Sequence, residues 1–335
     1  MTAPTDGRPG FLGVARSHVA KLSRPALLLL LVIVVLAGLI IVYGTAKASQ
    51  ATVNGFVAGT YIGLGAIGLT LILSVLKLVN FAYGDLLVAG AYLTIMFSWM
   101  GAPLPLAMVL AVLGTAVISL ATEKFVWRPL RKSGASTLQS LLSAIGLGFV
   151  IRFTIQFFGG SQSRTLGADV TSTIILGPIR VGTLQALSLL FGVAAVMVFG
   201  LALRFTKMGK AIRAFSDNQT LAEVSGINAS KTIDVTWIVS GLIAGTAGVL
   251  YAAAIGSFNP NFGVALLLSL FAAAILGGIG NAYGALAGGI VMGLSQEWST
   301  LLFSARWKPA IGLALLVAML LTMPNGIFGR SQRQS

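Results

Sequence analysis

The chain of 335 residues has no cysteine, a single histidine (His18) and only 9% charged residues. Without cysteine, neither a disulfide framework nor a thiolate metal site can form. One histidine, placed in the N-terminal tail, excludes histidine-based metal clusters and a Ser-His or Cys-His catalytic pair within the rest of the chain. The sequence therefore predicts no metal site, no cofactor and no enzymatic activity.

Phosphate-binding motifs are also missing. No G-x-x-x-x-G-K-[ST] sequence occurs, so the chain cannot bind ATP through a P-loop, and ATP-driven work would need another subunit. One GxGxxG match, from Gly63 to Gly68, lies inside an apolar run with no preceding strand, and it indicates helix packing rather than a dinucleotide site.

What the chain has in abundance is apolar residues. They make up 56% of the sequence, and the mean hydropathy is +0.94. Soluble domains carry roughly a quarter charged residues, so this composition predicts a polytopic membrane protein. The net charge of +14 does not indicate nucleic-acid binding, because the basic residues lie in short loops between apolar runs.

Ten apolar segments approach the length of about 20 residues that a transmembrane helix needs. Several are short, so the sequence predicts an all-α, polytopic helical bundle with about eight to ten transmembrane helices. The segments are 26–43, 53–73, 86–100, 104–122, 138–158, 186–203, 232–252, 263–279, 284–298 and 309–323.

The basic residues set the expected orientation. With ten spans, the tail before residue 26, the loops 123–137 and 204–231, and the C-terminus fall on one side, and they hold 15 of the 22 lysines and arginines. This bias places all four regions, and both termini, in the cytoplasm. The expected domains are a basic tail (1–25), a transmembrane domain (26–330) containing the cytoplasmic loop 204–231, and a short tail (331–335).

The first apolar segment has two readings. Basic residues, an apolar run and the triplet Ala46-Lys47-Ala48 together resemble a signal peptide with its cleavage site. The run is about 18 residues long, beyond the 7–15 residues typical of signal peptides. We therefore expect a retained helix.

Loop 204–231 carries five basic residues and two acids, which is too polar for lipid. A basic helix start followed by AEVSGI predicts a folded docking element for a cytoplasmic partner. A short helix is expected to end at Gly226, because glycine readily adopts the left-handed conformation, and the small Ala222 face would fit a groove on the partner. The candidate docking residues are Lys207, Gly209, Arg213, Ala222, Glu223 and Gly226.

Segment 77–85 places a cation, an amide, a phenol and a carboxylate between apolar runs. Polar groups at membrane depth must face protein or water. They either lie at a helix break near the inner end of a translocation pathway, or form a cytoplasmic turn in which Asn80 and Asp85 cap the next helix. Segment 280–284 has the same two readings. The candidate pathway residues are Asn80, Tyr83, Gly84, Asp85, Asn281 and Tyr283.

Glycine dominates the architecture, with 41 residues. Gly55, Gly59 and Gly63 are spaced by four, a pattern that lets helix backbones approach closely. Two echoes are consistent with an inverted repeat: GFVAGT at 55 with GLIAGT at 241, and FAYG ending at 84 with NAYG ending at 284. Chance similarity between glycine-rich helices is the alternative.

Six motifs in order give the chain a family resemblance: NFAYGD (80–85), WRPLR (127–131), KMGKAIRAFSDN…AEVSGIN (207–228), SGLIAGTAGVLY (240–251), AAAILGGIGNAYGALAGGIVMGL (272–294) and PNGIFGR (324–330). Over about residues 50–330 the chain resembles the permeases of branched-chain amino acid ABC importers. It has Tyr83 where that family usually has histidine, and Asp85 where it usually has glutamate. These departures leave urea, short-chain amides and simple sugars, which other members transport, as alternative substrates.

The resemblance implies a permease subunit in the bacterial inner membrane that forms half of a translocation pathway for branched-chain or other small neutral amino acids. Its implied partners are a second, similar permease subunit or a second copy of itself, two cytoplasmic ATPase subunits that contact 207–228, a periplasmic or lipid-anchored substrate-binding protein, and membrane lipids. A different class, an ion-coupled secondary transporter, would need an intramembrane carboxylate, for which Asp85, Asp234 and Glu297 are the candidates.

Overall fold

The computed structural model describes residues 24–166, 172–278, 280–322 and 326. Most of the predicted basic tail 1–25, the tail 331–335, and the motif at 324–330 except Gly326 therefore lie outside the described residues. The chain divides into two units, Met1–Ala48 and Ser49–Ser335. In the first unit, the expected span 26–43 forms helix α2 (Arg24–Tyr43), which ends at Gly44.

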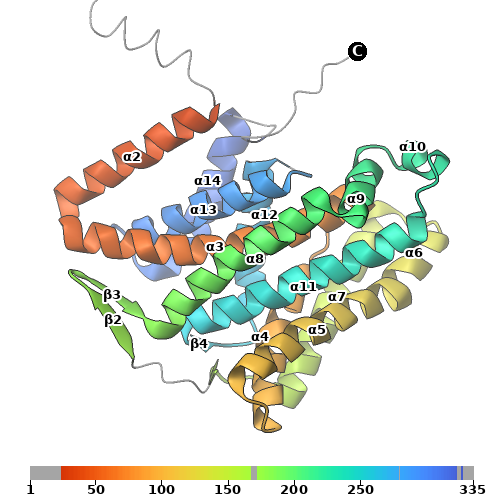
Figure 1. Cartoon of the computed structure of the whole chain (residues 1–335), viewed down its shortest axis with the longest axis horizontal. Helices are drawn as coiled ribbons and strands as arrows, with labels where there is room; N and C mark the ends of the chain where they lie inside the picture. The colour runs from red at the N-terminus through yellow and green to blue at the C-terminus, as the bar shows by residue number, and fades with distance from the viewer. Residues whose placement is uncertain (1–23, 167–171, 279, 323–325, 327–335) are drawn as a thin grey trace, which may run out of the picture. The chain divides into compact units, whose positions relative to one another are not determined.

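The second unit is a helical bundle (Figure 1). Two antiparallel strand pairs accompany it: β1 (Arg164–Thr165) with β4 (Ser257–Phe258), and β2 (Thr173–Leu176) with β3 (Ile179–Gly182). Its helices are α3 (Thr45–Leu76, which begins in the first unit), α4 (Tyr83–Trp99), α5 (Leu104–Thr122), the π-helical turn η1 (Glu123–Trp127), α6 (Arg128–Lys132), α7 (Thr137–Gly159), α8 (Thr183–Phe205), α9 (Lys207–Asp217), α10 (Gln219–Val224), α11 (Ala229–Ile255), α12 (Phe262–Gly277), α13 (Ala282–Ser299), the 3₁₀ turn η2 (Ala305–Trp307) and α14 (Lys308–Thr322).

The predicted all-α, polytopic architecture is confirmed, and each of the ten apolar segments falls on a helix. Within the described residues, five helices are long and apolar enough to cross a membrane unaided: α3, α5 continued to Lys132, α7, α8 and α11. Others are shorter, such as the 16-residue α12. The count of eight to ten spans therefore stays a prediction.

Side-chain caps explain where several helices begin. The Ser136 hydroxyl and the Gln139 side chain form a reciprocal capping box at the start of α7. Asn228 and Asn281 each accept hydrogen bonds from backbone N–H groups in the first turn of α11 and α13, at 2.9 and 3.1 Å. These caps satisfy donors that would otherwise have no partner at a helix start.

Glycines allow the closest crossings, as their spacing predicts. A Cβ added to Gly289 of α13 would lie 2.2 Å from the Cα of Gly63 in α3. One added to Gly293 would lie 2.3 Å from the backbone nitrogen of Gly59. No side chain fits between these backbones, so the glycine row on α3 is what allows α13 to pack this closely.

Helices α3, α4, α5 and α7 correspond, in this order, to α11, α12, α13 and α14 in the partners that they pack against. Helix α11 packs on α4 and α5, while α3 meets α12 at Gly65 and α13 at Gly59. Helix α4 packs on α7, and α12 packs on α14. This correspondence of packing partners fits an internal repeat and places the echo between 55 and 241 on the equivalent helices α3 and α11; that the repeat is inverted stays a prediction. The FAYG and NAYG echo spans the starts of α4 and α13, which are not equivalent in this arrangement.

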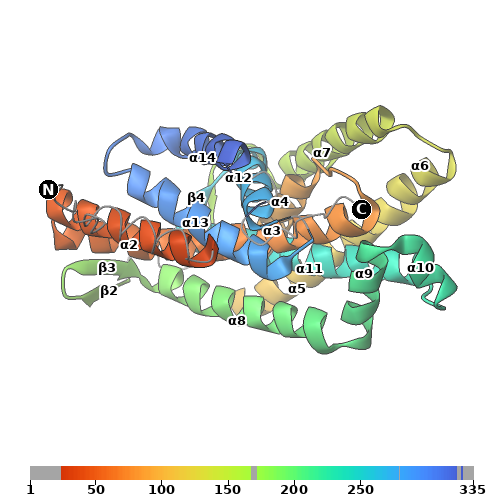
Figure 2. The same ribbon diagram turned by 90° about the horizontal axis from the view of Figure 1, so that it is seen from above.

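The two predicted cytoplasmic loops lie at the same end of the second unit. Figures 1 and 2 both place α6, α9 and α10 at one end, and the strands β2 and β3 at the other. Two contacts tie this end together: Arg128 pairs with Asp234 of α11, and the Lys77 amine donates to the Ser216 carbonyl at 3.4 Å. Loops 123–137 and 204–231 thus share one side, as expected, while their assignment to the cytoplasm stays a prediction.

Candidate functional site

Residues 207–228 fold into two short helices at the end of α8. The Thr206 hydroxyl caps α9 by accepting from the backbone N–H of Gly209 at 3.0 Å. A Cβ on Gly209 would lie 2.2 Å from the Leu203 carbonyl oxygen, so only glycine permits this tight turn from α8 into α9. Ile212 and Phe215 are buried, and Lys207, Lys210 and Arg213 are exposed. The segment is therefore a packed element with a basic outer face.

Helix α10 presents apolar side chains to the outside. Leu221 is 63% exposed and Val224 is 82% exposed, whereas Ala222 is 4% exposed in a helix that packs against α9. The Ala222 side chain predicted to meet a partner thus lies inside the chain's own packing. Its neighbours Leu221, Glu223 and Val224 form the outer surface. Sequence reasoning missed Leu221 and Val224, although two apolar residues in a charged loop were a usable signal.

Gly226 adopts the left-handed conformation that the sequence predicted. Its φ is +86°, and its N–H donates to the Glu223 carbonyl at 3.0 Å, just beyond the end of α10. Nothing lies within 4 Å of a Cβ built there. The backbone conformation, rather than lack of space, therefore requires glycine.

The end of α3 touches this segment. Lys77 follows the last residue of α3 and has a φ of +54°, unusual for a residue other than glycine. Its side chain reaches the Ser216 carbonyl in α9. The break between α3 and α4 is thus in direct contact with the predicted docking element.

The candidate residues 80–85 are buried at that break. Asn80 is 1% exposed, and its Oδ1 accepts from the Ala82 N–H at 3.0 Å, which stabilises the turn before α4. Tyr83 is 0% exposed, and its hydroxyl donates weakly to the Ser240 carbonyl at 3.4 Å. The Ser240 hydroxyl in turn donates to the Gly68 carbonyl at 2.8 Å. Tyr83 therefore links α4 to α3 and α11.

Asp85 forms a two-pronged ion pair with Arg152 of α7. The Nε of Arg152 lies 2.8 Å from Oδ1 of Asp85, and its Nη2 lies 3.0 Å from Oδ2. Arg152 stands fifteen residues after Thr137, the first residue of α7, or about 22 Å along the helix. Asp85 thus lies deeper than the inner end at which the sequence placed it, because the chain runs back among the helices before α4 begins.

The remaining pathway candidates fall elsewhere. Gly84 packs against the backbone of Gly263 at the start of α12. Asn281 caps α13, and Tyr283 is 54% exposed beside it, at a turn whose Gly280 lies near Ser74 of α3. The structure therefore groups Asn80, Tyr83, Gly84 and Asp85 and leaves Asn281 and Tyr283 apart. That any of the six lines a pathway stays a prediction.

The acidic side chains in the described part of the chain are not clustered for metal binding. No group of three or more His, Asp or Glu side chains there could hold a metal ion. The three carboxylates considered for ion coupling each have a cationic partner: Asp85 with Arg152, Asp234 with Arg128, and Glu297 with Lys308.

Comparison with known proteins gives a consistent result. The family model described as "Branched-chain amino acid transport system / permease component" matches residues 51–323. The chain is 31% identical over 297 residues to LivH of Salmonella typhimurium, named a high-affinity branched-chain amino acid transport system permease protein; the match covers 84% of this chain and 96% of LivH.

BraD of Pseudomonas aeruginosa, a protein of the same description, is 29% identical over 299 residues, covering 84% of this chain and 96% of BraD. The ribose import permease protein RbsC of Haemophilus influenzae is 27% identical over 174 residues, which is 50% of this chain and 51% of RbsC. No solved structure matches the chain.

Proposed function

This chain belongs to the family of branched-chain amino acid transport permease components, and we propose from this that it is the permease subunit of an ATP-driven importer, forming one half of the translocation pathway. Branched-chain or other small neutral amino acids are the proposed substrates. The match to LivH over 84% of the chain carries this choice, since the match to the ribose permease covers only half.

The partners follow from the same proposal. Two ATPase subunits dock in the cytoplasm, because the chain has no P-loop of its own. A second permease subunit, homologous or identical, completes the pathway, and a periplasmic or lipid-anchored binding protein delivers the substrate. The proposed location is the bacterial inner membrane, with both termini in the cytoplasm, as the loop charges favour.

ATPase docking is supported by the exposed apolar and basic side chains on the surface of α9 and α10. Leu221 and Val224 are exposed on a segment too charged to enter lipid, beside the basic side chains of α9. Exposed apolar residues with a charged rim are typical of protein interfaces. We assign this surface, with Lys207, Gly209, Arg213, Ala222, Glu223 and Gly226 as its framework, to the ATPase contact.

The proposed mechanism is alternating access. ATP binding closes the ATPase pair and displaces α9 and α10. The Lys77–Ser216 contact passes this displacement to the break before α4, where Asp85 and Arg152 join α4 to α7. Ion-coupled secondary transport is less well supported, because each of its three candidate carboxylates already has a cationic partner.

Uptake into cells with and without this chain tests the proposal. Labelled leucine uptake is expected to require the chain and to stop when ATP is depleted at constant membrane potential. Loss of ribose or urea uptake with leucine uptake intact would reject the amino-acid substrate and keep the importer class. Uptake that survives ATP depletion but collapses with the ion gradient would reject the ATP-driven class.

A further inference from the structure

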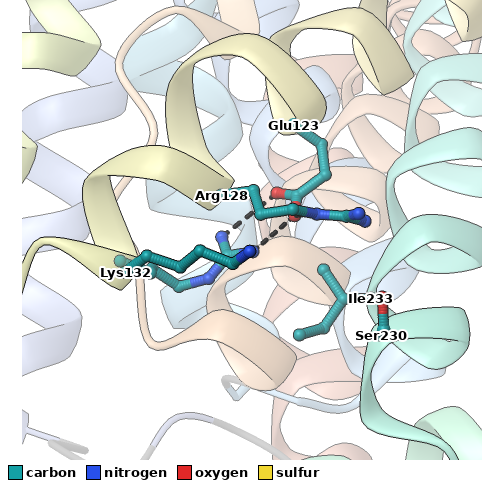
Figure 3. A pocket seen from close by; sticks show the side chains of 6 residues that line it. Glu123, Arg128, Lys132, Ser230 and Ile233 are labelled. Carbon is teal, nitrogen blue, oxygen red and sulfur yellow. Dashed lines mark hydrogen bonds and ion pairs between the residues drawn. The ribbon is translucent and has the colours of Figure 1, made fainter.

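A pocket that the proposed transport function does not use lies beside the start of α11. Its volume is about 330 Å³, and Glu123, Arg128, Arg131, Lys132, Ser230 and Ile233 line it. Figure 3 shows the basic side chains gathered around Glu123 on one wall, and Ser230 and Ile233 of α11 on the other. The volume is at the lower end of the range for small-molecule sites, roughly 300–1,000 Å³.

Glu123 holds two of the basic side chains in place. Its side chain is 0% exposed, and its carboxylate pairs with both guanidinium groups of the pocket. Arg131 donates from Nη1 to Oε2 at 3.1 Å and from Nη2 to Oε1, and the Nε of Arg128 lies 3.6 Å from Oε1. Removing a partner from such a buried charge is strongly destabilising, so Glu123 fixes the two arginines on the pocket wall.

The pocket keeps an excess of positive charge and free donors. Arg128, Arg131 and Lys132 supply three cations, against two carboxylates, Glu123 and Asp234. A guanidinium has five N–H donors, and the hydrogen bonds of Arg131 to Glu123 use two of them. The Lys132 ammonium has no ion-pair or hydrogen-bond partner in the described part of the chain. An anion with several oxygens would satisfy these donors.

Helix α5, which leads to the pocket, exposes apolar side chains, as a helix in contact with lipid does. Leu106, Val109, Leu113 and Val117 of α5 are all exposed and spaced by three or four residues, so they form one apolar stripe. Phe125, 80% exposed, continues this apolar exposure into η1, three positions before Arg128. The apolar stripe therefore runs toward the basic pocket.

We propose that this pocket binds the phosphate headgroup of an anionic phospholipid, with Arg128, Arg131 and Lys132 receiving the phosphate oxygens and the acyl chains lying along the exposed stripe of α5. Basic pockets between membrane helices are suited to this role. A soluble phosphate has the same headgroup chemistry, but it would make no use of the apolar stripe. The site requires only the fold of this chain, so it can be tested without the other transporter subunits.

The test is native mass spectrometry of the purified full chain, titrated with phosphatidylglycerol or with phosphatidylcholine of the same acyl chains. The unmodified chain is expected to bind the first phosphatidylglycerol more tightly than the first phosphatidylcholine. Lys132→Gln is expected to weaken phosphatidylglycerol binding roughly fivefold, the effect of one basic residue near an anionic headgroup. Ile233→Trp fills the pocket without changing charge, and it is expected to remove the preference.

The matched control is Lys124→Gln, which removes another exposed lysine, from the preceding π-helical turn η1, that does not line the pocket. Equal losses in Lys124→Gln and Lys132→Gln, or no preference between the two lipids, would overturn the proposal. Displacement of phosphatidylglycerol by millimolar inorganic phosphate at constant ionic strength would reassign the site to a soluble anion. Unchanged lipid binding in Lys132→Gln, with loss of a co-purifying protein, would reassign it to a protein contact.

Discussion

Asp85 and Arg152, 67 positions apart, meet in a two-pronged ion pair that fastens the start of α4 to the second half of α7. Asp85 is 1% exposed, so its charge has little access to solvent. A buried charge without a partner is far less stable than a paired one. The start of α4 is therefore held against α7, and separating the two helices would leave both charges without a partner.

Replacing Asp85 by Asn should lower the free energy of unfolding by about 3–5 kcal/mol, because Arg152, whose side chain is only 15% exposed, would lose its counter-charge. The measurement is the thermal unfolding midpoint of the purified chain in detergent. The double variant Asp85→Asn, Arg152→Gln should recover part of the loss. Asp217→Asn, at an exposed acid of α9, is the control and should leave the midpoint unchanged. An additive double variant would argue against a coupled pair.

Gly226→Val should weaken association with the ATPase while leaving the permease folded in the membrane. A residue other than glycine at φ +86° is strained by about 1–2 kcal/mol or more, so the turn after α10 would shift. Co-purification of the ATPase subunit measures the effect. Gly134→Val is a matched control, since Gly134 has φ +72° and equally open surroundings in a different loop. Equal losses from both variants would mean that strain alone, rather than the docking turn, is responsible.

Leu221→Asp and Val224→Asp should each reduce ATPase co-purification by at least tenfold, since each places a charge on the exposed apolar surface of α10. A tenfold change corresponds to about 1.4 kcal/mol. Thr220→Asp adds the same charge to an exposed polar position of the same helix, and it should have little effect. Full ATPase recovery with both apolar positions changed would reject this surface as the contact.

Cysteine labelling can tell whether the α3–α4 break opens during transport. Cysteines at Asn80, Tyr83 and Asp85 should be inert to a small polar thiol reagent in the resting protein, because all three are at most 1% exposed. A cysteine at Tyr283, which is 54% exposed, is the reactive reference. Reactivity gained at the break when ATP is trapped would place it on the pathway, whereas inertness in both states would make these residues purely structural.

Reporter fusions after Arg131, Asp217 and Arg330 should all report a cytoplasmic location. The structure places the first two at one end of the bundle, so they must agree with each other whatever the orientation. The excess of lysine and arginine in these loops then selects the cytoplasm. An external signal at Asp217 would reverse the orientation and remove the basis for ATPase docking there.

Apolar run lengths were sufficient to predict the helices, and glycine spacing predicted that α3 has a face for close helix packing. That α13 packs there was not predicted. The left-handed turn at Gly226 was also predictable, because it depends on a single residue's backbone preference. The positions of side chains relative to other helices were not. The burial of Ala222 depends on the packing of α10 against α9, and the partner of Asp85 lies 67 residues away. Neither leaves a local pattern in the sequence.

The predicted position of the α3–α4 break was incomplete because it, too, depends on contacts between residues far apart in the sequence. The order of polar residues from Lys77 to Asp85 correctly indicated a helix break. The expected caps were wrong, because α4 begins without a side-chain cap: Asn80 accepts from the Ala82 N–H in the preceding turn, and Asp85 pairs with Arg152. The order of residues could not give depth, because a chain that turns back among helices has the same local sequence as one that turns at the surface. The ion pair with Arg152 locates Asp85 along α7.

The contact between Gly84 and Gly263 joins the first turns of α4 and α12 backbone to backbone. A Cβ on either residue would lie 2.3–2.4 Å from the other's carbonyl oxygen, so no side chain cushions the crossing. Because the two backbones touch directly, a tilt of α4 at this crossing would displace α12. Helix α12 extends about 24 Å from this point, so a rotation of about 10° there would swing its far end by about 4 Å. A tilt that begins in the first half of the chain would therefore produce a larger displacement at the far end of α12 than at the crossing itself.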